Sequence, residues 1–167
     1  MVSFTISDDL IATHWQRIAN YLLDLVFQMI FMFCVLTGVI VIALLAKLDG
    51  LIYWTLHMGI FHQYLFAIVI AILYYGLSET LLGRSIGKFI TGTIIVMEDG
   101  SAPDSHVILK RTFCRLIPLE WITFLGMPSR GWHDSIPGVY VVDKKLFDAA
   151  RQKFKSQTKS STDITAI

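Results

Sequence analysis

The sequence predicts an all-α membrane protein with two transmembrane helices, together with a cytoplasmic-side amphipathic or re-entrant helical pair and short β segments. Three observations support this class: two long apolar runs, few charged residues, and an uneven distribution of the basic residues. The 167-residue chain is 54% hydrophobic and 16% charged, with a mean hydropathy of +0.61. Soluble domains carry about 25% charged residues, so this chain lacks the polar surface that a water-soluble fold requires.

Both apolar runs are long enough to cross a bilayer. The first, residues 18–46, contains one charged residue, Asp24. As a helix it would extend about 43 Å, which exceeds the ~30 Å hydrocarbon core. The second, residues 59–78, contains no Asp, Glu, Lys or Arg and has about the 20 residues that a span needs. No Lys or Arg precedes Arg17, so we expect the first run to be retained rather than cleaved as a signal peptide.

The chain changes character after the second span. A β-branched run, residues 93–97, ends at a Glu-Asp-Gly turn and predicts a strand or hairpin. A third apolar region, residues 107–127, contains three basic residues, a proline and Glu120. Each charge near the bilayer centre costs about 2.5 to 3.5 kcal/mol, and proline ends or kinks a helix. We therefore expect two interfacial or re-entrant helices within residues 105–127, with a third span as the alternative.

The domain organisation and topology follow from charge placement. We expect one membrane domain over residues 1–149 and a basic, disordered tail over residues 150–167. Lys47 is the only one of the 14 Lys and Arg residues between the two spans. Because basic segments remain in the cytoplasm, this asymmetry predicts that both termini are cytoplasmic. The net charge of +1 indicates no nucleic-acid partner.

Polar residues of the first span lie on one helical face. Arg17 and Asp24 are two turns apart, and Asn20 and Gln28 fall close to the same stripe. A buried carboxylate must be neutral, paired, or facing protein or water. Asp24 is therefore either a proton- or cation-binding group with Arg17 as its charge partner, or a structural pin. The stripe ends at Gln28, which counts against a complete ion pathway.

The end of the second span contributes a further polar group. Helical spacing and side-chain direction predict that Tyr75 reaches toward Asp24 and that Glu79 pairs with Arg17. The alternative is that Tyr74 and Tyr75 are ordinary interfacial aromatics.

Two loop motifs fail as chemical sites. Residues 83–88, GRSIGK, have three residues between the glycines where a P-loop needs four, and Phe89 follows the lysine where a P-loop needs Ser or Thr. The His133-Asp134 pair lacks other ligands for a metal, so we expect Asp134 to dock its turn on the preceding basic helix. No nucleophile and base are paired, and we expect no enzyme activity, cofactor or metal.

Several motifs together resemble the RDD family of bacterial integral membrane proteins, named for one Arg and two Asp. They are WQRIANYLLDLV with Arg17 and Asp24, TLLGRSIGKFITGTIIVMEDG, KRTFCRLIP with Arg115, and RGWHDSIPGVYVV with Asp134. The resemblance covers residues 13–143 and departs from the family at Val139, where Thr is usual. It implies a multi-pass protein of the inner membrane with two spans. For some members it implies cation/proton antiport.

Two functions remain open. In the first, the chain is a non-catalytic accessory or assembly component, and Arg17, Asp24 and Asp134 pin its fold. In the second, it is a proton-coupled monovalent cation transporter with Asp24 as the exchangeable carboxylate and Asp134 as a gate. Two spans cannot enclose a path, so transport in the bilayer would require a homo-oligomer or a larger membrane-protein partner. The supporting residues of either site are Asn20, Gln28, Tyr75, Glu79 and Arg115.

Overall fold

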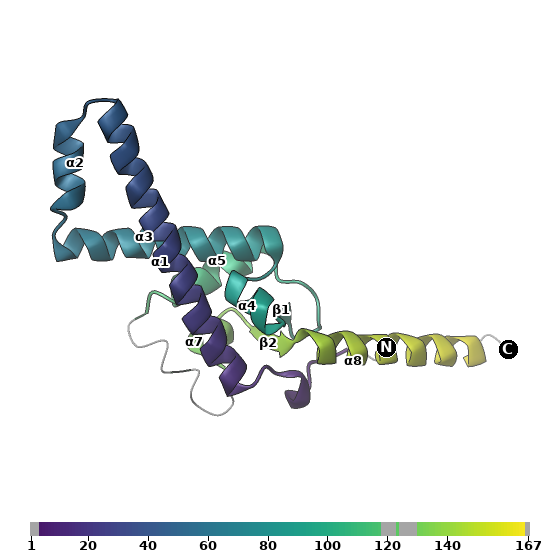
Figure 1. Cartoon of the computed structure of the whole chain (residues 1–167). Coiled ribbons are helices and arrows are strands. Elements are labelled where there is room, and N and C mark those ends of the chain that lie inside the picture. Colours follow the sequence, from purple (N-terminus) through teal and green to yellow (C-terminus); the bar gives the residue numbers. More distant parts are fainter. Residues whose placement is uncertain (1–3, 118–122, 124–129, 166–167) are drawn as a thin grey trace.

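The computed structural model describes residues 4–117, 123 and 130–165. This part of the chain is predominantly helical with one small sheet (Figure 1). In chain order the elements are η1 Asp8–Leu10, α1 His14–Leu45, α2 Asp49–Leu56, α3 Ile60–Leu82, α4 Ile86–Thr91, β1 Thr93–Met97, α5 Ser105–Cys114, α7 Trp132–Ser135, β2 Val139–Asp143 and α8 Lys144–Thr165.

Two helices, α1 and α3, are long and apolar enough to cross a membrane, as predicted. Their most apolar windows have mean hydropathies of 2.7 and 2.0. α1 begins four residues before the predicted run because Thr13 and Gln16 form a capping box at its N-terminus. The connection between them contains a short helix, α2, which the sequence analysis did not predict (Figure 1).

The buried face of α1 is polar. Its buried residues are Arg17, Asn20, Asp24 and Ala43, whereas large apolar side chains such as Leu22 and Met29 are exposed. A soluble helix shows the opposite arrangement, with its apolar stripe toward the core. The outer surface of α1 is therefore suited to lipid, and its polar stripe is directed into the protein.

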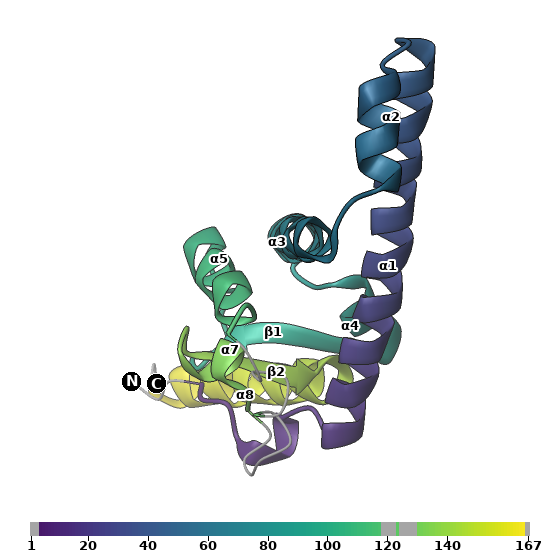
Figure 2. The same cartoon turned by 90° about the vertical axis from the view of Figure 1, so that its left-hand side faces the viewer.

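The sheet consists of β1 and β2, paired antiparallel from Thr93–Asp143 to Met97–Val139. It extends from the base of α1 toward α5 and α7 (Figure 2). Two small apolar clusters pack on it: Leu10, Val96, Val142 and Phe147 form one, and Ala12, Ile95, Val139 and Val141 form the other. The predicted strand at residues 93–97 is confirmed as β1.

The predicted helical pair is described only in its first half. α5 begins after the N-cap residue Asp104, close to the predicted start, and ends at Cys114. The second predicted helix falls mostly on residues 118–122 and 124–129, which lie outside the described residues. The glycine-rich segment before β1 also contains a short helix, α4. It lies between Gly83 and Gly92, and these two glycines adopt the left-handed backbone conformation.

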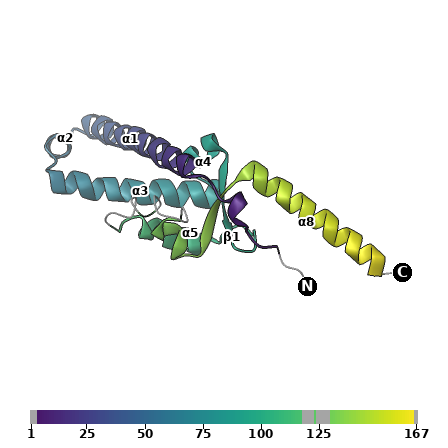
Figure 3. The same ribbon diagram turned by 90° about the horizontal axis from the view of Figure 1, so that it is seen from below.

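The C-terminal segment differs from the predicted disordered tail. Residues 144–165 form α8, which projects away from the body of the protein (Figure 3). Phe147, Ala150 and Phe154 recur at helical spacing, and the N-terminal Phe4 packs edge-on against both phenylalanine rings. The helix is thus anchored by a segment distant in sequence, which tail composition alone did not reveal.

Candidate functional site

Asp24 is held by hydrogen bonds from two other helices. Its Oδ1 accepts from the Tyr74 hydroxyl at 2.8 Å and from the Gly87 N–H at 2.8 Å. Its Oδ2 accepts from the Ser85 hydroxyl at 2.7 Å, while Lys88 Nζ lies 4.0 Å away. The carboxylate is 1% exposed. Asp24 therefore joins α1 to the second half of α3 and to the first turn of α4.

Gly87 makes this contact possible. A Cβ at this position would lie 2.6 Å from the Asn20 carbonyl oxygen and 2.7 Å from Asp24 Oδ1. Only glycine permits such an approach of α4 to α1. Asn20 also donates to the Thr93 hydroxyl at 3.0 Å, which ties α1 to β1.

Glu79, at the end of α3, is surrounded by cationic side chains. It is fully buried and accepts from Arg111 Nη1 at 2.7 and 2.8 Å, from Lys88 Nζ at 2.9 Å and from Arg115 Nη2 at 3.2 Å. The Arg115 guanidinium also lies 3.6 Å from the centre of the Tyr75 ring, a cation–π contact.

Asp134 closes the arrangement from α7. It accepts from Arg17 Nη1 at 2.6 Å and from Arg111 Nε at 2.8 Å, and Arg111 Nη2 lies 2.6 Å from it. Arg111 therefore bridges Glu79 and Asp134. We call Arg17, Asp24, Glu79, Lys88, Arg111, Arg115 and Asp134 the ion-pair network.

Three network residues outside the two candidate spans, Lys88, Arg111 and Asp134, have shifted pKa values. Burial by itself would raise the pKa of Asp134, but Arg111, His133 and Arg17 hold that pKa well below its usual range. Burial opposes the charge on Arg111, yet Asp134 and Glu79 raise its pKa. Burial lowers the pKa of Lys88 to about 8, although Glu79 opposes this shift. The charged forms of Asp134 and Arg111 are thus stabilised, whereas Lys88 loses its proton more readily than an ordinary lysine.

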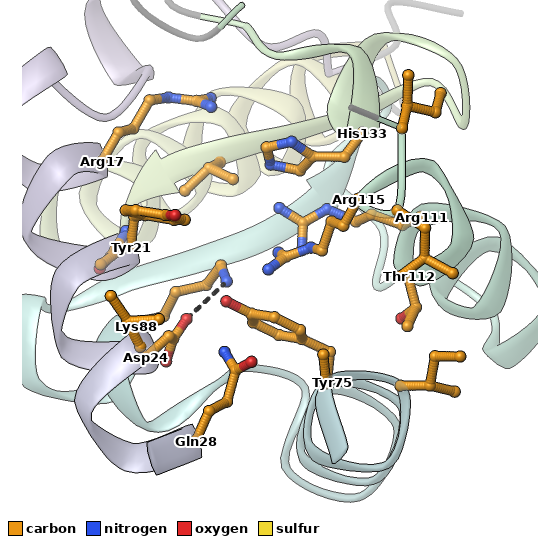
Figure 4. A pocket seen from close by; sticks show the side chains of 17 residues that line it. Arg17, Tyr21, Asp24, Gln28, Tyr75, Lys88, Arg111, Thr112, Arg115 and His133 are labelled. Carbon is orange, nitrogen blue, oxygen red and sulfur yellow. Dashed lines mark ion pairs between the residues drawn. The ribbon is translucent and has the colours of Figure 1, made fainter. Parts of the chain in front are cut away.

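A cavity of about 210 Å³ lies beside the network, between α1, α3 and α5 (Figure 4). Its polar lining residues include Arg17, Asn20, Asp24, Gln28, Tyr75, Lys88, Arg111 and Arg115. Its apolar lining residues include Leu25, Ala71, Ile72, Leu116 and Ile117. The cavity lining therefore combines cationic with aliphatic side chains.

The structure brings the predicted site residues together but changes their partners. Arg17 does not serve as the charge partner of Asp24, because its guanidinium extends to Asp134 on α7. Glu79 does not pair with Arg17, because the basic groups of α4 and α5 surround it. Tyr74, rather than Tyr75, donates to Asp24. Docking of Asp134 on the basic helix is confirmed through Arg111.

Five residues that contact Asp24 or belong to the network were not predicted as site residues: Tyr74, Ser85, Gly87, Lys88 and Arg111. Ser85 and Lys88 belong to the glycine-rich motif that was rejected as a P-loop, and that motif binds the Asp24 carboxylate instead of a phosphate. The sequence pattern that could have indicated this contact is Lys88 close to Gly83, Gly87 and Gly92. No sequence pattern distinguished Arg111 from its neighbour Lys110. Only the packing of α5 decides that Arg111 is buried and Lys110 is exposed.

The fold and the site together define a class: a mostly helical protein with two helices long and apolar enough to cross a membrane, whose polar faces contact a buried ion-pair network. The chain belongs to the RDD family, whose model matches residues 11–142. No curated protein and no solved structure matches it.

Proposed function

We propose that this chain is a non-catalytic accessory or assembly component of the bacterial inner membrane, in which the ion-pair network holds the sheet and α5 against the two spans. One observation carries the proposal: all three carboxylates of the network accept hydrogen bonds from at least two other segments of the chain. A carboxylate engaged in this way acts as a structural pin, because removing either partner leaves a buried charge uncompensated.

Cation/proton exchange is the competing function, and two features of the site weigh against it. Both oxygens of Asp24 already accept hydrogen bonds from Tyr74, Ser85 and Gly87, so a cation would have to displace protein donors. The adjoining cavity is lined by four cationic side chains, which repel a cation at short range.

Reconstitution into liposomes separates the two functions. For the accessory role we expect the purified wild-type protein to show no pH-driven flux of Na⁺, K⁺ or Li⁺ above that of protein-free liposomes. The Asp24→Asn variant serves as the matched control, because it keeps the side-chain size but cannot titrate. Robust exchange by the wild-type protein that is lost in Asp24→Asn would overturn the accessory role.

We further propose that the sheet, α5 and α8 lie in the cytoplasm. The basic residues support this side, since Lys47 is the only one of 14 between α1 and α3. A reporter fused after Lys145 should therefore read cytoplasmic, whereas one placed at Asp49 should read periplasmic. A periplasmic signal after Lys145 would contradict this topology.

A further inference from the structure

We infer that the cavity beside the ion-pair network is a binding site for a phosphate-bearing anion, whose charge is received by Arg17, Lys88 and Arg115. The inference concerns space that the network leaves open and does not depend on the accessory role. It rests on the charge balance of the site, on two donors without acceptors, and on the size and lining of the cavity.

The charge balance favours an anion. Among the described residues the network contains four cationic side chains and three carboxylates, an excess of one positive charge. All four cations line the cavity, whereas Glu79 and Asp134 are not among the described lining residues and are already paired. An excess buried charge is costly unless a counterion or water compensates it.

Two donors in the cavity wall have no acceptor among the residues that the structure describes. They are the Nε–H groups of Arg17 and Arg115, both buried. Arg17 is 6% exposed, so bulk water does not satisfy it. Guanidinium groups bind phosphate oxygens through strong charge-assisted hydrogen bonds, and a lysine adds a point charge. An anion in the cavity would supply negative charge beside these two guanidinium groups.

Among the described residues, Asp24 is the one carboxylate in the cavity lining, and its oxygens are already engaged. They accept from Tyr74, Ser85 and Gly87, with Lys88 Nζ 4.0 Å away. These donors offset its negative charge locally, so the wall that faces the cavity remains cationic.

The dimensions and lining suit a phosphate group. A volume of about 210 Å³ is several times that of one water, ~30 Å³ in the liquid, and lies below the ~300 Å³ at which sites for drug-sized ligands begin. The lining also includes the aliphatic side chains of Leu25, Ala71 and Ile72. Basic pockets between membrane helices accept phospholipid headgroups, and these aliphatic side chains would contact the attached chain. Inorganic phosphate carries the same chemistry without the chain.

Calorimetric titration of the purified full-length protein in an uncharged detergent tests the site. The probes are inorganic phosphate, a short-chain phosphatidylglycerol and, as the zwitterionic control, the matching phosphatidylcholine. We expect phosphatidylglycerol to bind at least about tenfold more tightly than phosphatidylcholine. Binding of phosphatidylglycerol alone assigns a lipid headgroup, and binding of inorganic phosphate alone or together with it assigns the phosphate group itself. Binding of neither anion overturns the inference.

Variants locate the binding. Arg115→Gln removes a cavity cation yet leaves Glu79 its contacts with Arg111 and Lys88, and we expect the affinity to fall about 10- to 150-fold. Lys110→Gln, an equal loss of charge at an exposed position of α5, should leave affinity unchanged. Ala71→Leu keeps every charge but narrows the cavity that Ala71 lines, so it too should weaken binding. It replaces Arg115→Gln as the test if that variant does not fold. Equal effects of Arg115→Gln and Lys110→Gln, or unchanged binding in Ala71→Leu, would refute the assigned site.

Discussion

The guanidinium of Arg17 donates a 2.6 Å hydrogen bond to Asp134, a residue 117 positions further along the chain. Both side chains are buried, and Arg111 binds the second oxygen of the same carboxylate. This pair joins the start of the first span to the short helix α7, so the membrane helix and the segment before β2 are held as one unit.

Breaking this pair should be strongly destabilising. We expect Asp134→Asn to lower the free energy of unfolding by about 3 to 5 kcal/mol, because it removes the carboxylate that both Arg17 and Arg111 bind. Arg17→Gln should cost less, about 1 to 3 kcal/mol, because Asp134 keeps its contacts with Arg111. The double variant should cost less than the sum of the two, with a coupling of about 1 to 3 kcal/mol. Denaturant titration in detergent micelles measures both quantities. Lys153→Gln, on the exposed surface of α8, is the control and should stay within about 0.5 kcal/mol of wild type. Strict additivity would show that the two residues act independently.

Asp134 also makes stability depend on pH. Its folded-state pKa is well below the usual 3.8 of an aspartate, so below pH 3.8 the unfolded chain binds more protons than the folded protein. The contribution of Asp134 is therefore fully present above its unfolded pKa and is lost as pH falls toward the folded pKa. We expect the stability difference between wild type and Asp134→Asn to be constant above about pH 5 and to shrink below it. A difference that grows on acidification would show the opposite sign of shift.

Substitution at Gly87 tests the close approach of α4 to α1. Gly87→Ala should destabilise the protein by about 1 to 3 kcal/mol, because its Cβ would meet the Asn20 carbonyl oxygen at 2.6 Å. Gly38→Ala is the matched control, since a Cβ at this α1 position has nothing within 4 Å. It should be neutral or stabilising, because alanine favours helix. Thermal unfolding of the two variants side by side provides the measurement. Equal melting temperatures would mean that α4 moves away from Asp24 without cost.

Asp24 itself should respond in graded fashion. It accepts from Tyr74, Ser85 and Gly87, so an asparagine can keep the two hydrogen bonds at one oxygen but presents an amide donor at the other. We expect Asp24→Asn to cost about 1 kcal/mol and Asp24→Ala about 1 to 3 kcal/mol more, as three donors lose their acceptor. Chemical denaturation of the two variants in micelles checks this order. Identical stability of Asp24→Ala and wild type would exclude a structural role for the carboxylate.

The distal part of α8 should be dispensable, in contrast to its first turns. Truncation after Arg151 removes Phe154, which is half-buried against Phe4, and should leave membrane insertion intact at a cost below about 1 kcal/mol. Phe147→Ala removes a ring from the core beneath the sheet and should cost about 3 to 5 kcal/mol. The yield of membrane-inserted protein and its melting temperature distinguish the two. Loss of insertion on truncation would indicate that the distal helix contributes to the folded membrane domain.

Local pattern was sufficient to predict α1, α3 and β1. Two uninterrupted apolar runs are enough to predict α1 and α3, because a membrane-spanning helix satisfies its own backbone hydrogen bonds and needs only apolar side chains over its length. The β-branched run at residues 93–97 and the turn that follows likewise predict β1 without knowledge of its partner. The stripe of Arg17, Asn20 and Asp24 follows from helical periodicity alone, and these residues are indeed the buried face.

The partners within the stripe were decided only by the tertiary structure. Asp24 and Glu79 were expected to share Arg17, because both lie near the same end of the spans. Glu79 instead binds Arg111, and Asp24 binds the first turn of α4. Arg111 is 32 residues from Glu79 and next to the exposed Lys110 in sequence. Long-range ion pairs depend on which face each helix presents after packing, and helical periodicity specifies that face only within one element. The sequence alone therefore determines which residues of α1 are buried, whereas the docking of α4, α5 and α7 determines which charges they meet.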